Sequence, residues 1–205
     1  MHVVIEPKIL YFGTSVVLIS TLNEDGTPNL APMSSAWWLN QSCMLGMSSK
    51  SQTVQNLLRE RECVLNLPST DLVHAIDQLT LLTGRDPVPA SKAQRGYQHE
   101  ADKFGIAGLT PMPSHHVRAP RVIECPIHLE ATLVNVHAVE EPSSLVALEV
   151  RIQKVHIEEH LQMDGHPHYV DPSKWKPLIM NFCEYFGLDR QLSSSRLAPV
   201  FGPTP

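Results

Sequence analysis

The strongest constraint on the fold is a strict alternation of apolar and polar residues at positions 123–133. The even positions are mostly polar, and the odd positions are apolar: Ile123, Cys125, Ile127, Leu129, Ala131 and Leu133. A period of two is typical of a β-strand with one face on the core and the other in water. The pattern returns further along the chain, with apolar residues at Val146, Leu148, Val150 and Ile152. These two segments predict a hairpin of two long antiparallel strands.

The polar face of the first long strand carries Glu124, His128 and Glu130. Carboxylates and imidazoles are common metal ligands, so a metal site is one interpretation. The residues spread along the strand, however, and no fourth ligand is evident in the sequence. We therefore expect an ordinary polar face in contact with water, and no metal site.

A continuous apolar run, SVVLIST at residues 15–21, precedes these strands. Its length and its β-branched residues favour a strand that is buried on both faces. In a small barrel, one face of such a strand fills the interior. The other face then needs cover from a helix or from a second subunit.

Residues 23–56 combine a turn, a strand of small residues and the start of a helix. Asp25-Gly26 predicts a two-residue hairpin turn, because glycine readily accepts a positive φ. Small residues follow at 34–36 and suit the close approach of a flat ligand. Gly46 interrupts the next strand, where a glycine often marks the approach of a ligand or of another backbone.

The segment from Ser48 to Thr53 is rich in hydroxyl groups, contains Lys50, and lies where a helix is predicted to begin. Helix N-termini attract phosphate, because their free N–H groups and the positive end of the helix dipole point outward. The simpler interpretation makes Ser51 an N-cap and Lys50 a solvated charge. The sequence leaves both interpretations open.

The segments TSVVLISTLNEDGTPNLAPMSS, SSKSQTVQNL, ECVLNLPS and RVIECPIHLEATL together resemble the flavin reductase-like family of FMN-binding split β-barrels. The resemblance spans roughly residues 9–157 and lies in the order and spacing of the segments. It implies a mainly β, Greek-key split barrel that binds FMN non-covalently, and a homodimer with two flavin sites near the subunit interface. The implied contacts of the flavin ring are Met33, Ser34, Ser35 and Ala36. The implied contacts of the phosphate are Ser49, Lys50, Ser51 and Thr53.

We expect residues 1–205 to form a single domain. Residues 71–120 are predicted to be an insertion of helices and loops that shapes access to the site, with a helix at 71–82 that Asp71 caps. A C-terminal helix is predicted at about 172–187, because apolar residues recur there at helical spacing and Gly187 would end it. The roles of four histidines stay open: His115, His116, His166 and His168. So does the question of which of Trp37 and Trp38 faces the flavin.

Composition excludes several classes of function. The net charge of −5 and the lack of a basic run argue against nucleic acid as a partner. No apolar segment approaches the roughly 20 residues of a membrane helix, and the N-terminus lacks the features of a secretory signal, so a cytoplasmic location away from membranes is expected. Four scattered cysteines are expected to be free, buried thiols: Cys43, Cys63, Cys125 and Cys183.

The chain contains no GxGxxG motif, phosphate-binding loop of the Walker type or GxSxG elbow, and no catalytic side chain is identified. We therefore expect a cofactor to supply the chemistry. The leading hypothesis is an FMN-binding oxidoreductase that uses NAD(P)H to reduce a flavin or another small-molecule acceptor. The alternatives are an FMN-binding electron carrier that takes electrons from a partner protein, and a structural or regulatory barrel without flavin.

Overall fold

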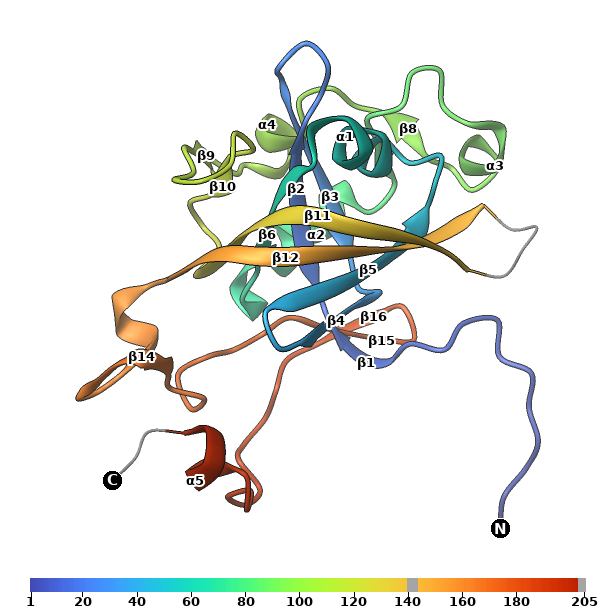
Figure 1. The fold of residues 1–205 in the computed structure, drawn as a ribbon. Helices are drawn as coiled ribbons and strands as arrows, with labels where there is room; N and C mark the ends of the chain where they lie inside the picture. The colour runs from blue at the N-terminus through green and yellow to red at the C-terminus, as the bar shows by residue number, and fades with distance from the viewer. Residues whose placement is uncertain (140–143, 203–205) are drawn as a thin grey trace.

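The computed structural model describes residues 1–139 and 144–202. At its centre is a sheet of seven strands in the order β3-β2-β6-β11-β12-β5-β4, in which all neighbouring strands are antiparallel. Their bounds are β2 (Val17–Leu22), β3 (Pro28–Met33), β4 (Ala36–Leu39), β5 (Ser42–Ser48), β6 (Glu62–Leu67), β11 (Ile127–Val139) and β12 (Leu145–Ile157). Figure 1 shows β11 and β12 crossing in front of β2 and β3 and projecting past the body of the molecule.

The predicted hairpin of two long strands is confirmed. β11 pairs with β12 from Ile127 opposite Ile157 to Val139 opposite Leu145. The odd positions of β11 from Ile127 to Leu133 are buried, and so are Leu148 and Val150 of β12. The strand begins later than the alternation suggested, because residues 123–126 form a turn that leads into β11.

The expectation that the even positions of β11 face water is wrong for His128 and Glu130, which are both buried. The segment at 113–120 lies over this face and binds the Glu130 carboxylate through backbone N–H groups. A buried carboxylate is tolerated only when hydrogen bonds replace its hydration, which these donors do. The alternation therefore predicted correctly which residues of β11 face the main core, but it did not predict that part of the opposite face is also buried.

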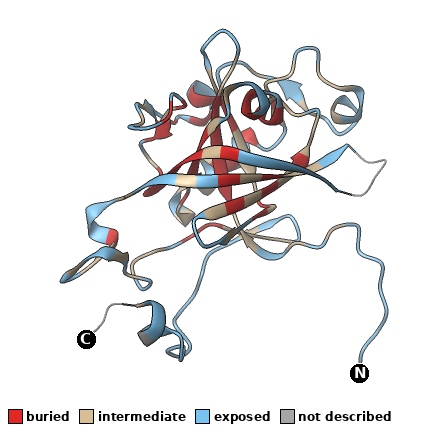
Figure 2. Cartoon of the chain, viewed as in Figure 1, coloured by how far each residue is buried: buried red, intermediate tan, exposed pale blue. Residues whose placement is uncertain are grey.

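The strand β2 is buried on both faces, as predicted. Val17 and Ile19 point into the main core, which lies among β5, β6, β11, β12 and α1 (Gln52–Glu60). Val16 and Leu18 belong to a second core. Figure 2 shows the buried residues concentrated where β2, β6 and β11 cross, while the projecting end of the long hairpin and both chain ends are exposed.

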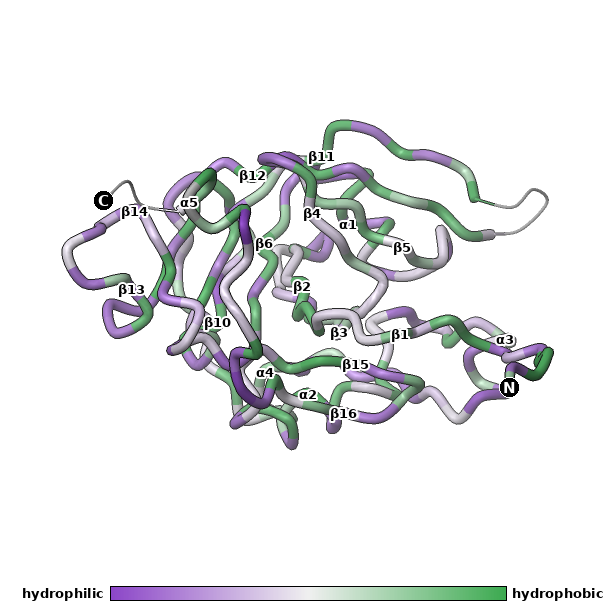
Figure 3. Tube along the Cα trace, turned by 90° about the horizontal axis from the view of Figure 1, so that it is seen from below, coloured by the Kyte–Doolittle hydropathy of each residue, from purple (hydrophilic) through white to green (hydrophobic). Residues whose placement is uncertain are grey.

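Elements of the same chain cover the second face of β2. They are α2 (Val73–Leu79), α4 (Lys103–Ala107) and the segment that leads into β15 (Ile179–Asn181). Figure 3 shows β15 lying next to α2, on the side of β3 that faces away from β11 and β12. Residues 16–21 of SVVLIST are therefore buried within one chain, so their burial does not by itself require a second subunit.

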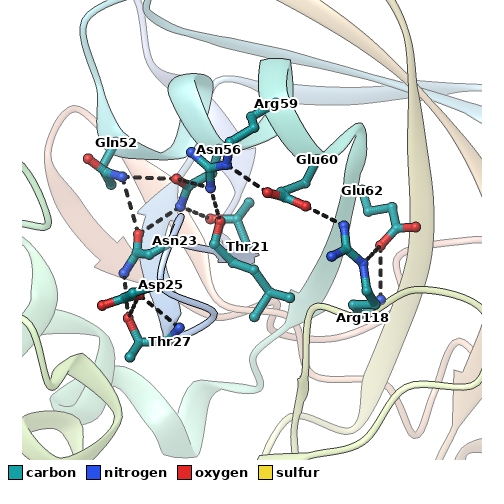
Figure 4. Close-up of polar contacts among 11 residues, drawn as sticks. Thr21, Asn23, Asp25, Thr27, Gln52, Asn56, Arg59, Glu60, Glu62 and Arg118 are labelled. Carbon is teal, nitrogen blue, oxygen red and sulfur yellow. Dashed lines mark hydrogen bonds and ion pairs between the residues drawn. The ribbon is translucent and has the colours of Figure 1, made fainter.

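Figure 4 shows the polar contacts that hold α1 against the turn between β2 and β3. Asn56 donates hydrogen bonds to Thr21 Oγ1 at 3.0 Å and to Asn23 Oδ1 at 2.9 Å. Gln52 donates to Asn23 Oδ1 at 3.2 Å. Because buried amides are costly unless they are paired, these bonds fix the orientation of α1 and the direction of its N-terminus.

The turn at Asp25-Gly26 is confirmed. Gly26 has a φ of +83°, which the absence of a side chain permits. The Asp25 carboxylate accepts hydrogen bonds from the backbone and the hydroxyl of Thr27 (Figure 4). These bonds lower the pKa of Asp25 and close the turn.

The region of the predicted insertion contains short elements. After η1 (Thr70–Leu72) come α2, β7 (Leu82–Thr83), α3 (Ala90–Ala93), β8 (Gln98–His99), α4, β9 (Pro111–Met112) and β10 (Arg121–Val122). The helix expected at 71–82 is shorter than predicted, and Asp71 does not cap it. Leu82 instead enters β7, which pairs with β8.

The prediction of a C-terminal helix at about 172–187 is wrong. The segment forms a hairpin of β15 and β16 (Glu184–Phe186), and β15 also pairs with β1 (Phe12–Ser15). Phe182 and Cys183 form its turn and both have positive φ, which suits a two-residue hairpin loop. Pro177 opposes a helix here, and the apolar spacing that suggested one arises because both sides of the hairpin contact apolar surface.

The rest of the described chain consists of η2 (Glu159–Leu161), the small hairpin of β13 (Gln162–Met163) and β14 (His166–Val170), and α5 (Ala198–Phe201). Among residues 1–139 and 144–202, no helix has both the length and the apolar character needed to cross a membrane.

Candidate functional site

Two adjoining cavities form one groove beside β3. They share Pro32, Met33, Thr80 and Tyr97 as lining residues. The smaller cavity, about 120 Å³, lies at the start of α1 and is lined by Lys92 and Lys103, so we call it the lysine end. The larger, about 350 Å³, is lined by Tyr11, Tyr97 and Tyr185, and we call it the tyrosine end.

The start of α1 supplies hydrogen-bond donors to the lysine end. Ser51 caps the helix, with its hydroxyl accepting from the Val54 N–H at 3.2 Å. The N–H groups of Gln52 and Thr53 have no acceptor among the described residues, and both residues line the cavity. Two free N–H groups at the positive end of a helix form a binding site for an anion.

The Thr53 hydroxyl adds a third donor. Thr53 is buried, and its Oγ1 accepts a hydrogen bond from Asn29 Nδ2 at 3.3 Å. The hydroxyl proton has no acceptor among the described residues and is free for a ligand. Gly84 lies against the same asparagine, since a Cβ there would come within 2.6 Å of Asn29 Oδ1. Glycine at this position therefore leaves room for the side chains of Asn29 and Gln52 beside the cavity.

Lys103 brings a positive charge to this end although its side chain is buried. Its Nζ donates to Asn29 Oδ1 at 2.9 Å and to the Leu30 carbonyl at 2.8 Å. Burial, together with the nearby charge of Lys92, lowers the pKa of Lys103 to about 8. No carboxylate forms an ion pair with either lysine within the described part of the chain.

Lys92 is half-buried at the same end. Its Nζ lies 3.4 Å from Thr83 Oγ1 and 4.9 Å from the centre of the Tyr97 ring. Burial lowers the pKa of Lys92 as well. Two neighbouring cations that lack a carboxylate partner are electrostatically unfavourable without an anion, so the lysine end suits a group such as a phosphate.

The tyrosine end is mainly apolar and extends along β3 away from the lysines. Its apolar walls come from Val16, Pro32, Met33, Ile76 and Met180. Polar groups stand at the edges. The Tyr185 hydroxyl lies 3.1 Å from Thr80 Oγ1, and the Ser35 hydroxyl donates to the Tyr11 hydroxyl at 3.3 Å. A flat, apolar ring system with polar edges fits these walls.

Four of the eight residues predicted to bind flavin line the groove: Met33, Ser34, Ser51 and Thr53. Met33 lies where the two cavities meet, Ser34 lines the tyrosine end, and Ser51 and Thr53 line the lysine end. The structure therefore brings together, in one groove, the two segments that the sequence suggested for the ring and for the phosphate.

The other four predicted residues do not line either cavity: Ser35, Ala36, Ser49 and Lys50. Ser35 borders the tyrosine end through Tyr11, and Ala36 is buried in the main core. The Ser49 N–H bonds to the Ser144 carbonyl, and the Lys50 side chain is exposed. The close approach at Gly46 is to Ser35, whose Cβ would lie 3.2 Å from a Cβ at Gly46.

The lysines were missed in the sequence because nothing local marks them. Lys92 and Lys103 lie in the insertion, tens of residues from the helix start that they face. An isolated lysine in a loop reads as a solvated charge, and only tertiary structure buries it. The one available signal was the length of the irregular segment, since long loops in compact domains are often functional.

The buried carboxylate of Glu130 proves to be structural. It accepts the N–H groups of His115 at 2.9 Å, His116 at 2.6 Å and Val117 at 3.3 Å, and lies 2.7 Å from His156 Nε2. Burial by itself raises the pKa of Glu130, but these hydrogen bonds outweigh burial, and the net effect lowers the pKa to about 2. No group of three or more potential ligands is arranged to hold a metal in the described residues, His166 and His168 included.

Neither tryptophan of the pair lines the groove. Trp37 is exposed, and Trp38 packs against the main core near Trp175. Three of the four predicted buried thiols are confirmed: Cys43, Cys63 and Cys125. Burial raises their pKa, to about 12 for Cys43. Cys183 is exposed and lines the tyrosine end, which corrects the expectation for that residue.

Comparison with known proteins identifies the family of this chain. Residues 9–185 match the flavin reductase like domain. The chain is 41% identical over 191 residues to the protein YdfE of Bacillus subtilis (strain 168), covering 93% of this chain and 91% of that protein.

Two solved structures share the fold. Flavoredoxin of Desulfovibrio vulgaris (Miyazaki F) aligns with a TM-score of 0.79 at 23% identity, over 97% of this chain and 99% of flavoredoxin. A protein with a split barrel domain from Shewanella frigidimarina NCIMB 400 aligns with a TM-score of 0.71 at 18% identity, over 89% and 86%. The predicted mainly β split-barrel fold is confirmed, and the chain belongs to the flavin reductase-like family.

Proposed function

We propose that this protein is an FMN-dependent oxidoreductase that uses NAD(P)H to reduce a flavin or another small acceptor. The observation that carries the proposal is the polarity of the groove. Among the described residues, one end holds N–H groups without an acceptor and two lysines without a carboxylate partner, and the other end is an apolar slot. FMN has this polarity, with a phosphate dianion at one end and a flat ring at the other.

The residues of the lysine end would bind the phosphate. The N–H groups of Gln52 and Thr53 and the Thr53 hydroxyl donate hydrogen bonds, while Lys92 and Lys103 supply charge. A dianion here would further favour the charged form of Lys103, because it offsets the effects of burial and of Lys92. Charge-assisted bonds of this kind contribute roughly 1.5–3 kcal/mol each.

The tyrosine end would orient the ring. Pro32, Met33 and Ser34 form one wall, and residues of α2 and of the β15–β16 hairpin form the opposite side. The N–H groups of Ser34 and Ser35 have no acceptor among the described residues and remain able to donate. When bound, FMN would supply the hydride chemistry, accepting two electrons from NAD(P)H and passing them to an acceptor. The side chains need only bind, orient and exclude water.

Titration of the apoprotein with FMN and with riboflavin tests the binding step. FMN is expected to bind on the order of 100-fold or more tightly, since riboflavin lacks the phosphate. Lys92→Met and Thr53→Ala should weaken FMN and leave riboflavin nearly unchanged. Lys50→Met is the matched control, because that side chain is exposed. Equal affinities for the two flavins in the parent protein would refute this assignment of the groove.

Anaerobic addition of NADH, and then of NADPH, to the FMN-loaded protein tests the redox step. Loss of the oxidised flavin spectrum within the mixing time, followed by turnover with an added acceptor, supports the oxidoreductase. A loaded protein that neither nucleotide reduces would instead support the electron carrier. We also propose a homodimer, supported by the exposed Val134 and Val136 on the projecting β11–β12 hairpin.

A further inference from the structure

We propose that the part of the tyrosine end left open beside the bound flavin ring admits a neutral planar electron acceptor, of the quinone class, in preference to an anionic one, and that Asp77 determines this selectivity. The inference rests on the proposed FMN-dependent activity and concerns its second substrate. It derives from the distribution of charge along the groove.

All of the positive charge that lines the groove lies at the lysine end. The tyrosine end is lined by one carboxylate, Asp77, and by no lysine, arginine or histidine among the described residues. Asp77 makes no ion pair in this part of the chain. A phosphate dianion would neutralise Lys92 and Lys103, after which the charge of Asp77 dominates the open end.

The surroundings of Asp77 place that charge beside the slot. The residue lies on α2, whose neighbouring Ile76 is fully buried in the second core, so the helix is held in place. Tyr185 is next to it, and burial together with the charge of Asp77 raises the pKa of the Tyr185 phenol. An anionic substituent brought to this position is repelled by the Asp77 carboxylate, whereas a neutral ring meets the same lining without that repulsion.

A quinone also suits the balance of the reaction. A hydride leaves the nicotinamide and one proton comes from solvent. The overall change is that NAD(P)H, a proton and the quinone give NAD(P)⁺ and the hydroquinone. Two electrons and two protons reduce the two carbonyl groups, and no further reactant is needed. The Tyr11 hydroxyl accepts a hydrogen bond from Ser35, so its own proton can be donated to a quinone carbonyl.

A pair of acceptors tests the proposal: 1,2-naphthoquinone and its 4-sulfonate, which share a ring system and differ by one anionic sulfonate group; comparing parent with variant cancels the difference in their intrinsic reactivity. The FMN-loaded parent and the Asp77→Asn variant are compared by kcat/KM for each quinone at low ionic strength. Because Asp77 is exposed and partly screened, the ratio of kcat/KM for the sulfonate to kcat/KM for the neutral quinone should be roughly 3- to 5-fold higher in the variant than in the parent.

Asp71→Asn is the control, since Asp71 is an exposed carboxylate of the same region that does not line this end. The selective gain should also disappear at high salt. An equal effect of Asp77→Asn on both quinones, or none, would overturn the role of Asp77 and leave the proposed function intact. Failure of the loaded parent to oxidise NAD(P)H with either quinone would instead refute the proposed function.

Discussion

Replacement of the buried Lys103 by methionine tests two claims about the lysine end. The first is that folding disfavours the charged form of Lys103 when no anion is bound, and the second is that this charge contributes to anion binding. The two side chains have similar length and shape, so the change removes charge with little loss of packing. In the folded apoprotein the pKa of Lys103 is lowered to about 8 from an ordinary value of 10.5, because the group is buried and Lys92 is near. The charged form is therefore disfavoured by folding.

The sign of the pH dependence follows from proton linkage. Between the two pKa values the unfolded chain binds more protons than the folded chain, so the free energy of unfolding rises with pH. Integrating from about pH 7.5 to about pH 9.5, with pKa values of about 8 and 10.5, gives a contribution from Lys103 of about 2 kcal/mol. Lys103→Met lacks this contribution, while other titrating groups are common to both proteins.

Urea unfolding of both apoproteins at the two pH values measures this difference. The rise in the free energy of unfolding should be about 2 kcal/mol larger in the parent than in Lys103→Met. Lys154→Met, at an exposed position on β12, should behave as the parent does. At the lower pH, Lys103→Met should also weaken FMN at least about 10-fold and leave riboflavin within about twofold.

A different outcome would refute the reasoning. If the parent and Lys103→Met respond equally to pH, then Lys103 is not held as a disfavoured cation in the folded state. If FMN and riboflavin weaken together, Lys103 supports the groove as a whole and does not act on the phosphate.

Three further predictions concern other parts of the molecule. Glu130→Leu should lower the free energy of unfolding by about 3–5 kcal/mol, because it removes the buried acceptor of three backbone N–H groups and of His156, whereas the exposed Glu158→Leu should cost less than about 1 kcal/mol. The stabilisation by Glu130 is expected above its ordinary pKa of 4.5 and should be lost as pH falls toward 2. In the native protein, a thiol reagent such as DTNB should modify about one thiol per chain, and none in Cys183→Ser, since Cys183 alone of the four cysteines is exposed; rapid reaction of a second thiol would contradict the buried positions of the others. Light scattering should give about twice the chain mass of 22.9 kDa, and Val134→Asp combined with Val136→Asp should reduce it to one chain, whereas a parent protein already at the mass of one chain would exclude the homodimer.

Local chemistry was sufficient for several parts of the site. The hairpin of two long strands, the turn at Asp25-Gly26 and the helix start at Ser51 were each predicted from neighbouring residues. The structure contains all three, although the first long strand begins at Ile127 and not at Ile123. They are predictable because strand period, positive φ and N-capping depend on residues close together in the chain. The pairing of the small-residue segment with the helix start came from the resemblance to a family, and Met33, Ser34, Ser51 and Thr53 do share one groove.

Only the tertiary structure decided which polar residues are buried and what faces the helix start. Glu130 was expected to face water and nothing in the sequence marked Lys103, yet each is enclosed by segments remote along the chain. The C-terminal segment was misread for the same reason, since its apolar residues serve a hairpin that pairs with β1 from the other end of the chain. Local periodicity reports which residues avoid water, but burial of charge and strand pairing depend on contacts made across the fold. Lys92 and Lys103 can contribute to the proposed phosphate site only because the fold places them beside the start of α1.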